Sequence, residues 1–327
     1  MSSTFLQLDL TEAQRDAISA HTPYRFHTIP VPPPPPAAAA EANHDHLVVE
    51  PYLPLPLTTS PPLILTPQRP TDVPRIVETL TDPAVGMQLI GPPWPFKAED
   101  AHSWGESLRA QAEEVFRDLK ARTEQLGEIS TNGYGEERER QEGENATTRK
   151  RWPIPAPKIH SLRRADNGAW AGDFGVTRWQ FDNVVDAEEK QRLIDENEAK
   201  EVLDPTVIWT YGCKSQALRV SLSSVPTPPA DTQRNSFPPL AVYLHPELHG
   251  KGLMSQVLES MLSTYFDDYL GANEVRGAAY ASNPASLKTQ ERCGFVRFGA
   301  FMEDVSEGRG GGQKEVITLR RVNPRLQ

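Results

Sequence analysis

The residues best suited to chemistry lie in the run His-Pro-Glu-Leu-His-Gly-Lys-Gly-Leu-Met at positions 245–254. This run follows the apolar segment Leu240–Leu244, which is typical of a buried strand, and it precedes an amphipathic helical pattern. A loop between a strand and a helix presents free backbone N–H groups and the positive end of the helix dipole. Its two glycines keep side chains away from those groups. The pattern predicts either a site for an anion such as a pyrophosphate or an ordinary tight turn.

A second run, Asn-Pro-Ala-Ser-Leu-Lys-Thr-Gln-Glu-Arg-Cys-Gly-Phe, occupies positions 283–295, one predicted strand later. Asn283 is a favourable N-cap, Pro284 suits the first helical position, and Gly294 suits the helix end. We therefore expect a short helix that flanks the same cleft as the glycine loop. The loop is not a P-loop, because no Gly-Lys-Ser/Thr closes it, and it lacks the three-glycine dinucleotide spacing.

The elements that must position these two runs alternate between strand and helix patterns, which is typical of an α/β chain. The pair Asn167-Gly168 predicts a tight hairpin between two of the strands. In chain order, the patterns predict strands at 63–66, 158–164, 170–181, 207–211, 240–244, 275–281, 295–302 and 315–319, and helices at 71–80, 101–119, 186–201, 253–269 and 284–293.

Composition divides the chain into a tail and one domain. Residues 1–46 contain a short helical pattern at 11–20, then five prolines and four alanines, and they have too little apolar surface to order themselves. We expect a disordered tail, either a semi-rigid spacer or a polyproline II ligand. Residues 47–322 are expected to form a single domain. Charge-rich and Pro/Ser-rich segments predict insertions in it at about 127–157 and 182–238.

Charge and cysteine content exclude several classes of partner. The formal net charge of −10 speaks against a general basic surface for nucleic acid or for an anionic membrane. Only two cysteines occur, Cys213 and Cys293, so neither a disulfide framework nor a four-thiolate zinc site is expected, and no metal is predicted. The sequence shows no signal peptide and no run of about 18 apolar residues. We expect a cytoplasmic protein, with the nucleus as an alternative.

Both runs resemble those of the GNAT superfamily of acyl-CoA N-acyltransferases. The segment 63–104, with Pro-Pro-Trp-Pro-Phe at 92–96, is similar to the opening of the ribosomal-protein N-terminal alanine acetyltransferase branch. The resemblance extends over residues 60–321. It implies an α/β (α+β) fold in which a central mixed, mostly antiparallel sheet is splayed between two parallel strands and flanked by about four helices.

The resemblance also implies where an acyl-CoA donor would lie. Backbone amides of residues 249–254 would hold the pyrophosphate, and the strand that ends at Leu244 would pair with pantetheine as an added strand would. At two positions the sequence departs from the family, which usually has Arg or Gln at His249 and Gly or Ala at Met254. The implied donor-binding residues are Leu244, His249, Gly250, Lys251, Gly252, Leu253, Met254, Asn283 and Ser286.

The chemistry implied by the family is direct attack of a neutral amine on the thioester in a ternary complex, with a backbone N–H near Leu244 facing the oxyanion. His245 is predicted as a base or water-orienting residue, with a loop cap before Pro246 as the alternative reading. Gln290 stands where the family often has an acidic tyrosine, so no acid is assigned. Asp173 is a secondary candidate, and Cys293 is expected to pack rather than react.

Three aromatic residues, Trp94, Phe96 and Trp179, are predicted to wall the acceptor pocket, with core packing as the alternative. The leading hypothesis is an acetyl-CoA-dependent N-acetyltransferase that acts on a primary amine, either a small metabolite or a protein amino group. The acidity of the chain favours a cationic amine. One alternative is a catalytically silent member that binds CoA or a protein partner. Another is a module that binds a nucleotide other than CoA.

Overall fold

The computed structural model describes residues 5–30, 47–89, 91–131, 151–154, 158–212 and 242–326, without the side chains of residues 127–131. Its strands are β1 (Arg25–Pro30), β2 (Leu47–Leu55), β3 (Leu63–Thr66), β4 (Ser161–Arg164), β5 (Trp170–Phe174), β6 (Val176–Arg178), β7 (Trp209–Tyr211), β8 (Val242–Leu244), β9 (Glu274–Tyr280), β10 (Val296–Asp304) and β11 (Gln313–Val322). Its α-helices are α1 (Glu12–His21), α2 (Val73–Thr81), α3 (Pro83–Gly86), α4 (Ala98–Thr131), α6 (Ala187–Ala199), α7 (Leu253–Met261) and α8 (Pro284–Arg292), and a π-helix, η5 (Leu262–Leu270), continues α7.

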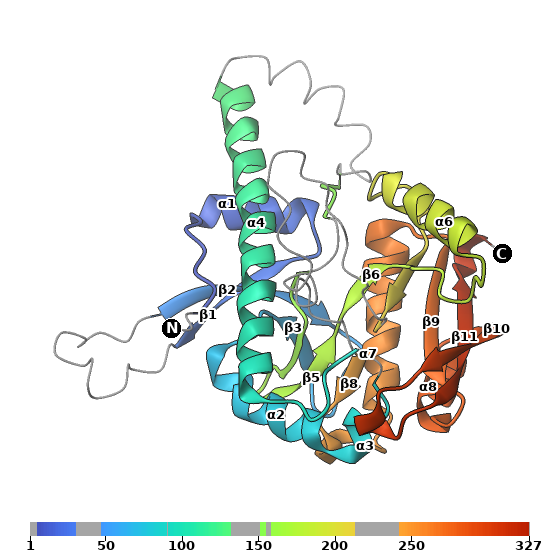
Figure 1. Cartoon of the computed structure of the whole chain (residues 1–327). Helices are drawn as coiled ribbons and strands as arrows, with labels where there is room; N and C mark the ends of the chain where they lie inside the picture. Colours follow the sequence, from blue (N-terminus) through green and yellow to red (C-terminus); the bar gives the residue numbers. More distant parts are fainter. Residues whose placement is uncertain are drawn as a thin grey trace, which may run out of the picture.

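The strands form two sheets that part from each other in the middle of the molecule (Figure 1). A six-stranded sheet has the order β1-β2-β3-β4-β5-β8, and a five-stranded sheet has the order β10-β11-β9-β7-β6. The strand pairs are antiparallel except for the parallel pair β7–β9. This arrangement confirms the predicted mixed, mostly antiparallel sheet. The hairpin predicted at Asn167-Gly168 joins β4 to β5, with Gly168 at a φ of 73°.

The two halves of the central strand are separated in sequence but continuous in space. Tyr211 pairs with Val176. The residue after Tyr211, Gly212, donates its N–H to Gly175 O at 3.1 Å, and Val242 pairs with Phe174. Val242 therefore takes the register position that follows Gly212, although residues 213–241 lie between them. The first half pairs with β9, whereas the second half is the last strand of the other sheet. The sheets separate at this junction, as the predicted splay requires.

The N-terminal segment is part of the fold, which corrects its assignment to a tail. Helix α1 has a capping box at Thr11, and β1 pairs with β2 along its whole length. Ile18 and Tyr24 are fully buried, and the Tyr24 ring lies 4.8 Å from the Phe116 ring of α4. Packing on α4 orders this segment, and the local composition does not reveal that contact. The proline run lies in residues 31–46, outside the described residues.

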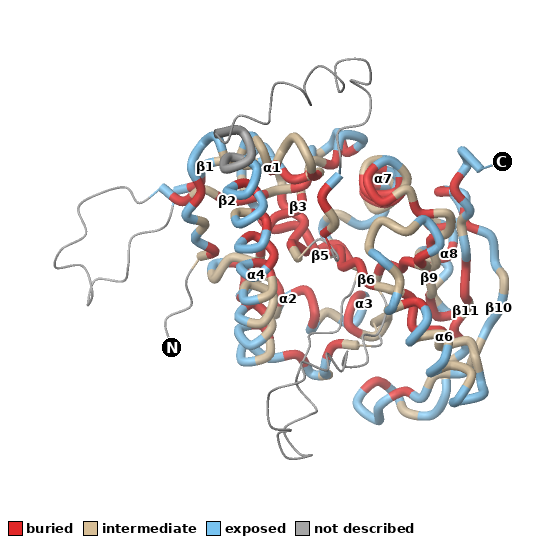
Figure 2. Tube along the Cα trace, turned by 90° about the horizontal axis from the view of Figure 1, so that it is seen from above, coloured by how far each residue is buried: buried red, intermediate tan, exposed pale blue. Residues whose placement is uncertain are grey.

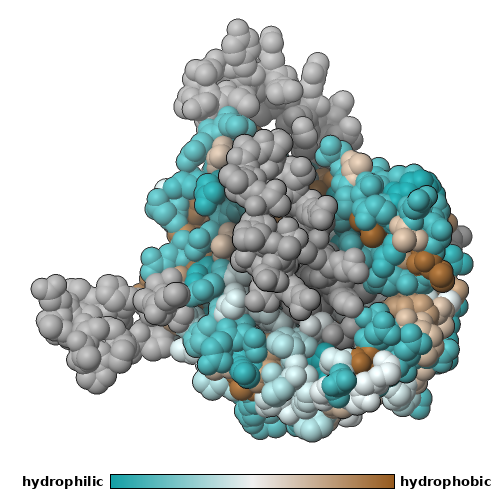
Figure 3. Space-filling model, viewed as in Figure 1, coloured by the Kyte–Doolittle hydropathy of each residue, from teal (hydrophilic) through white to brown (hydrophobic). Residues whose placement is uncertain are grey.

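Part of the second predicted insertion also packs as regular structure. Helix α6 covers Trp179 and Phe181, which form a buried cluster on the five-stranded sheet. Asn197 fixes α6 through two bonds with Ile208: its Nδ2 donates to the carbonyl at 3.0 Å, and its Oδ1 accepts the N–H at 2.9 Å. The outward face of α6 is hydrophilic (Figure 3). Residues 213–238 of this insertion, and most of 127–157, lie outside the described residues.

The main core lies between the sheets and α7. Figure 2 shows buried segments along β3, β5 and α7, whereas β10 is mostly exposed. Phe174, Trp209, Val257 and Phe266 are fully buried members of one cluster. About 25 cal/mol is gained per Å² of apolar surface that such packing removes from water. The core therefore holds α7 firmly beside β8, where the glycine loop begins.

A buried ion pair joins α2 to the six-stranded sheet. The Arg163 guanidinium donates to both carboxylate oxygens of Asp72, at 3.1 and 2.7 Å, and both side chains are buried. Arg163 also donates to Thr66 Oγ1 and to Gly168 O, at 3.1 and 2.9 Å. Asp72 in turn accepts the Arg69 N–H at 2.7 Å. This network fixes the start of α2 against β3 and β4.

Candidate functional site

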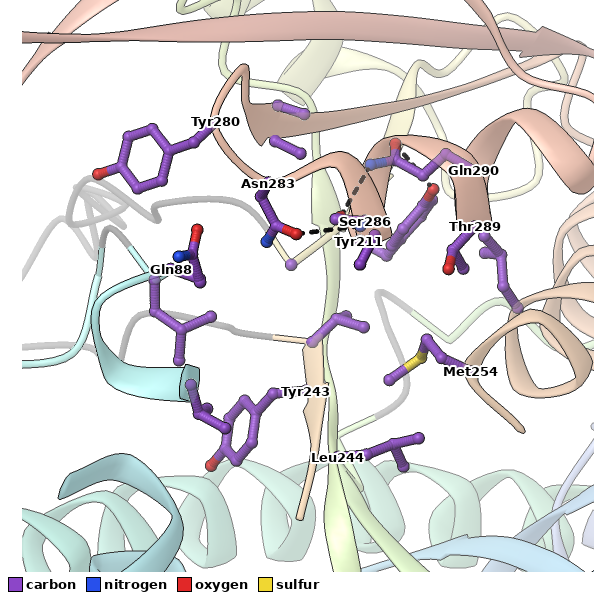
Figure 4. A pocket seen from close by; sticks show the side chains of 18 of the residues that line it. Gln88, Tyr211, Tyr243, Leu244, Met254, Tyr280, Asn283, Ser286, Thr289 and Gln290 are labelled. Carbon is purple, nitrogen blue, oxygen red and sulfur yellow. Dashed lines mark hydrogen bonds between the residues drawn. The ribbon is translucent and has the colours of Figure 1, made fainter. Parts of the chain in front are cut away.

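The candidate site is a cavity of about 690 Å³ between the glycine loop, α8, β8 and α3 (Figure 4). At one end, which we call the glycine end, the walls are residues 248–250, residues 252–255 and α8. At the other end, the α3 end, the walls include Ala84, Gln88 and Tyr280. Figure 4 shows Gln88, Tyr243 and Tyr280 on one side of the cavity and Met254 and Thr289 on the other.

The cavity passes through the gap between the two sheets. Successive strand residues point to opposite faces, so Tyr243 and Leu244 face opposite sides of β8. Tyr243 packs in the cluster of α2 and α3, whereas Leu244 packs in the cluster of α7, and both line the cavity. The cavity therefore continues around the free edge of β8, from the face of α7 and α8 to the face of α3.

The free edge of β8 exposes backbone groups to the cavity. His245 N donates to Ala171 O at 2.8 Å, so in the alternating antiparallel ladder the N–H and C=O of Leu244 point away from β5. His249 Nε2 contacts that carbonyl at 2.9 Å. Because a carbonyl oxygen can only accept, His249 carries its proton on Nε2. The Leu244 N–H points in the same direction.

The glycine loop has the geometry of an anion-binding turn. Gly250 and Gly252 have φ angles of 74° and 70°, and a Cβ at either position would meet no atom within 4 Å. Gly252 is the N-cap of α7, so the free N–H groups at the start of this helix lie at the cavity wall. The cavity brings together the predicted residues Leu244, His249, Gly250, Gly252, Leu253, Met254, Asn283 and Ser286, but Lys251 does not line it.

Helix α8 closes the cavity opposite the loop. Asn283 Oδ1 accepts the Ser286 N–H at 3.1 Å, which is the predicted N-cap. Gln290 Nε2 donates to Ser286 Oγ at 3.3 Å, and Tyr211 Oη donates to Gln290 Oε1 at 3.2 Å. The Tyr211 hydroxyl is thus directed to α8, while its ring lines the cavity. These hydrogen bonds hold the α8 wall in place, and they engage the Tyr211 hydroxyl.

Charge is distributed unevenly along the cavity. Lys288 and Arg292 line the cavity from α8. The end of α8 lies beside the start of α7, as the contact of 3.6 Å between Cys293 Sγ and Ser255 O shows. Asp182 and Glu303 supply the carboxylates. Asp182 pairs with Lys190 at 2.7 Å. Burial and then the charge of Glu303 raise the pKa of Tyr280, which places Glu303 at the α3 end. Lys288 and Arg292 thus supply positive charge at the glycine end, and Glu303 supplies a carboxylate at the α3 end.

Residues 159–296, which include both runs that wall the cavity, match the model of a known family, described as the acetyltransferase (GNAT) domain. The chain carries a GNAT domain. The match confirms the predicted family, fold class and acyltransferase class. No curated protein matches the chain.

Several solved structures are similar to this GNAT domain. The ribosomal-protein-S5-alanine acetyltransferase from Vibrio fischeri shares 12% identity over 81% of this chain and 95% of its own, with a TM-score of 0.39. A GNAT-family acetyltransferase from Bacillus anthracis shares 10% identity over 80% and 95%, with a TM-score of 0.42. Spermidine N-acetyltransferase from Vibrio cholerae, in complex with CoA and spermine, shares 12% identity over 80% and 95%, with a TM-score of 0.37. Sequence identity this low does not indicate which amine acceptor this chain uses.

The aromatic residues predicted for the acceptor pocket do not line the cavity of the GNAT domain. Trp94 packs on Gly86 and Gly308, Phe96 packs edge to face against Trp104, and Trp179 is buried under α6. Their segments contribute through other residues instead, namely Gly91, Pro92 and Asp182. For Phe96 and Trp179 the physical reason is that large aromatic rings gain more from burial in the core than from a solvated pocket.

His245 also lies outside the cavity lining. Its side chain is buried, and its Nδ1 accepts the Glu247 N–H at 3.3 Å, as an N-cap does for the short turn η4 (Pro246–Leu248). The geometry favours the loop-cap alternative over a base that touches the reacting atoms. No sequence motif marks Gln88, Tyr211 and Tyr280, which line the cavity. For Tyr243, the predicted strand at 240–244 was informative, because alternate residues of a strand face opposite sides.

Asp173 is a buried carboxyl group behind the cavity wall. Tyr243 Oη donates to its Oδ2 at 2.5 Å, and Ser161 Oγ donates to its Oδ1 at 3.1 Å. Burial raises the pKa of Asp173 to about 6, against the lowering effect of these two hydrogen bonds. Asp173 thus holds the Tyr243 ring in place. Burial also raises the pKa of Cys293 to about 12, which agrees with a packing role.

The raised pKa of Asp173 predicts a dependence of stability on pH. In the unfolded state the Asp173 carboxyl has its ordinary pKa of 3.8, whereas in the folded state it keeps its proton up to about pH 6. The stability that the protonated carboxyl contributes is therefore complete below pH 3.8 and is lost as the pH rises to about 6. The shift corresponds to about 3 kcal/mol. Asp173→Asn cannot ionise, so urea unfolding of this variant should lack that loss between pH 4 and pH 7. An identical loss in the variant would contradict the assignment.

None of the helices in the described residues is long and apolar enough to cross a membrane. Within the same ranges, no three His, Cys, Asp or Glu side chains are placed to hold a metal ion.

Proposed function

We propose that this GNAT domain transfers an acetyl group from acetyl-CoA to a primary amine by direct attack in a ternary complex. The observation that carries the proposal is the passage of one cavity through the gap between the sheets, lined by both Tyr243 and Leu244. The donor enters from the glycine end and the amine from the α3 end. The two substrates then meet at the free edge of β8.

The glycine end fits the donor. A Cβ at Gly250 or Gly252 would meet no atom within 4 Å, and the backbone N–H groups of the loop and of the first turn of α7 suit the pyrophosphate. Lys288 and Arg292 supply positive charge for the remaining phosphate. The Leu244 backbone would pair with pantetheine amides, as an added strand pairs with a sheet edge. His249 already contacts Leu244 O, so pantetheine would share or displace that bond.

The free edge of β8 also supports the chemistry. The nitrogen of a neutral amine attacks the thioester carbonyl carbon, and the N–H of Leu244 faces the position where the oxyanion develops. When the tetrahedral intermediate collapses, the C–S bond breaks and CoA leaves as a thiolate. The amine releases one proton and the thiolate takes one up, so the exchange balances without a further reactant.

The acceptor is an amine of a small metabolite or of a protein. Glu303 favours an acceptor that carries an additional positive charge, because a carboxylate attracts a cation more strongly in a partly dry cavity than in bulk water. Gln88 and Tyr280 offer further polar contacts at that end.

The test is release of the free CoA thiol from acetyl-CoA by the full chain, across a panel of polyamines, amino acids and peptides with free N-termini. We expect release above the rate of hydrolysis with at least one cationic amine. A specific observation favours the alternative of a silent CoA-binding member: Gln290, which cannot act as an acid, takes the hydroxyl bond of Tyr211. Tight binding of acetyl-CoA without release across the whole panel would favour that alternative.

A further inference from the structure

A histidine outside the cavity holds the turn that leads into the glycine loop. His245 is 4% exposed and directly follows β8. Its Nδ1 accepts the Glu247 N–H at 3.3 Å and lies 3.4 Å from Arg75 Nη2 of α2. Arg75 also pairs with the Glu247 carboxylate at 2.5 Å. These three side chains join the turn η4 to α2.

The contacts define the protonation state of the ring. Backbone N–H and guanidinium groups can only donate, so Nδ1 must be the acceptor and Nε2 must carry the proton. Nε2 is buried and has no hydrogen-bond partner, and Glu78 Oε1 lies 3.6 Å from it. The charged groups that face the ring are therefore Arg75 and Glu78 from α2 and Glu247 from the turn itself.

The turn η4 is connected to both ends of the cavity. Leu248 and His249 follow it directly, and both line the cavity. The bond from His249 to Leu244 O closes the same turn from its other side. On the far side, α2 continues into α3, whose Ala84 and Val85 line the α3 end. A change at His245 therefore acts directly on the turn that leads into the glycine loop.

We propose that His245 is a positioning residue for the donor: it holds the glycine loop in its binding conformation while Nδ1 is unprotonated, and acetyl-CoA affinity falls when Nδ1 gains a proton. The proposal rests on the proposed function of the glycine loop. It gives this domain a built-in sensitivity to acid that does not require a titrating group inside the cavity.

The protonated ring must rearrange. A proton on Nδ1 would oppose both the Glu247 N–H and the Arg75 guanidinium, so the cap of the turn is lost. The carboxylate of Glu247, 3.5 Å from Nδ1, and that of Glu78 would attract the new charge. The ring would then exchange a bond to the Glu247 backbone for one to the Glu247 side chain, which releases the turn.

The experiment compares the wild-type chain with His245→Asn. Asparagine is among the best N-cap residues, so its carbonyl oxygen can accept the Glu247 N–H, and it does not titrate. Acetyl-CoA dissociation constants are measured by calorimetry at about pH 8 and about pH 5.5, the range in which histidine changes charge. Loss of one capping bond corresponds to about a tenfold weakening for the wild type, whereas His245→Asn should weaken much less.

Other titrating groups are the same in both proteins. The donor phosphates and every ionisable side chain except that of residue 245 are the same in the two experiments, so the difference between the two pH profiles reports His245 alone. Parallel weakening in both proteins, or none in either, overturns the proposal. Absence of binding at pH 8 in the wild type would instead contradict the proposed function.

A second measurement uses no variant. We expect the hydrogen-exchange protection factor of the Glu247 amide to fall in the wild type as pH decreases across the same range, because its acceptor is lost. A protection factor that does not change with pH would contradict the proposal even if His245→Asn failed to fold.

Discussion

Replacing Gly252 with Trp should abolish binding of acetyl-CoA and leave the fold intact. Gly252 lines the cavity and a Cβ there would meet no atom within 4 Å, so an indole at this position is expected to occupy the region where the pyrophosphate is proposed to lie. We expect the dissociation constant to rise by more than about a hundredfold, equivalent to about 2.8 kcal/mol. The measurement is calorimetric titration of the variant with acetyl-CoA, together with its circular dichroism spectrum.

The matched control for Gly252→Trp is Gly312→Trp. Gly312 has a φ of 71°, close to the 70° of Gly252, it is exposed, and a Cβ there would also meet no atom within 4 Å. Both variants carry the same backbone cost of about 1–2 kcal/mol for a side chain in the left-handed region. Only Gly252 lines the cavity. Equal donor affinity in the two variants would refute the placement of the pyrophosphate.

Replacing Asp72 with Ala should destabilise the protein by about 3–5 kcal/mol, because it leaves the buried Arg163 guanidinium without its carboxylate. The remaining acceptors of Arg163, Thr66 Oγ1 and Gly168 O, are neutral. The variant also loses the acceptor of the Arg69 N–H at the start of α2. Chemical denaturation at neutral pH measures this effect as a change in the free energy of unfolding.

Glu189→Ala is the control for Asp72→Ala. Glu189 accepts two bonds from Arg192, at 2.8 and 2.7 Å, so the geometry of the pair is similar, but both side chains are about half exposed. Exposed pairs contribute little because water screens them, and the unfolding midpoint should hardly change. A double variant, Asp72→Leu with Arg163→Met, should recover much of the loss, since no unpaired charge remains buried. Equal losses in the single and double variants would contradict this explanation.

The parts of the site that could be predicted from sequence are those set by neighbouring residues. The glycine loop depends on two glycines at positive φ, and the start of α8 depends on Asn283 as N-cap. Turn and cap preferences act within a few residues of the chain, so the sequence displays them directly. The hairpin at Asn167-Gly168 was predictable for the same reason.

The parts that could not be predicted depend on contacts between distant segments. Tyr24 is buried because α4 covers it, although the composition around it is typical of a tail. Gln88 reaches the cavity because α3 lies beside β8, and no local pattern encodes that approach. His245 and His249 lie in one short run, yet one turns toward α2 and the other toward the cavity edge. Only the packed structure separates their roles.

The interrupted central strand makes this domain tolerant of insertion beside its cavity. Closing the loop between Gly212 and Val242 has an entropic cost that grows only with the logarithm of its length, by about 0.6 kcal/mol for each doubling. The register of both halves is held by β5, β6 and β9, whatever the length between them. Gly212 and Val242 both line the cavity. A reporter domain spliced between them would have both of its ends anchored in the cavity wall, where its signal would follow ligand binding.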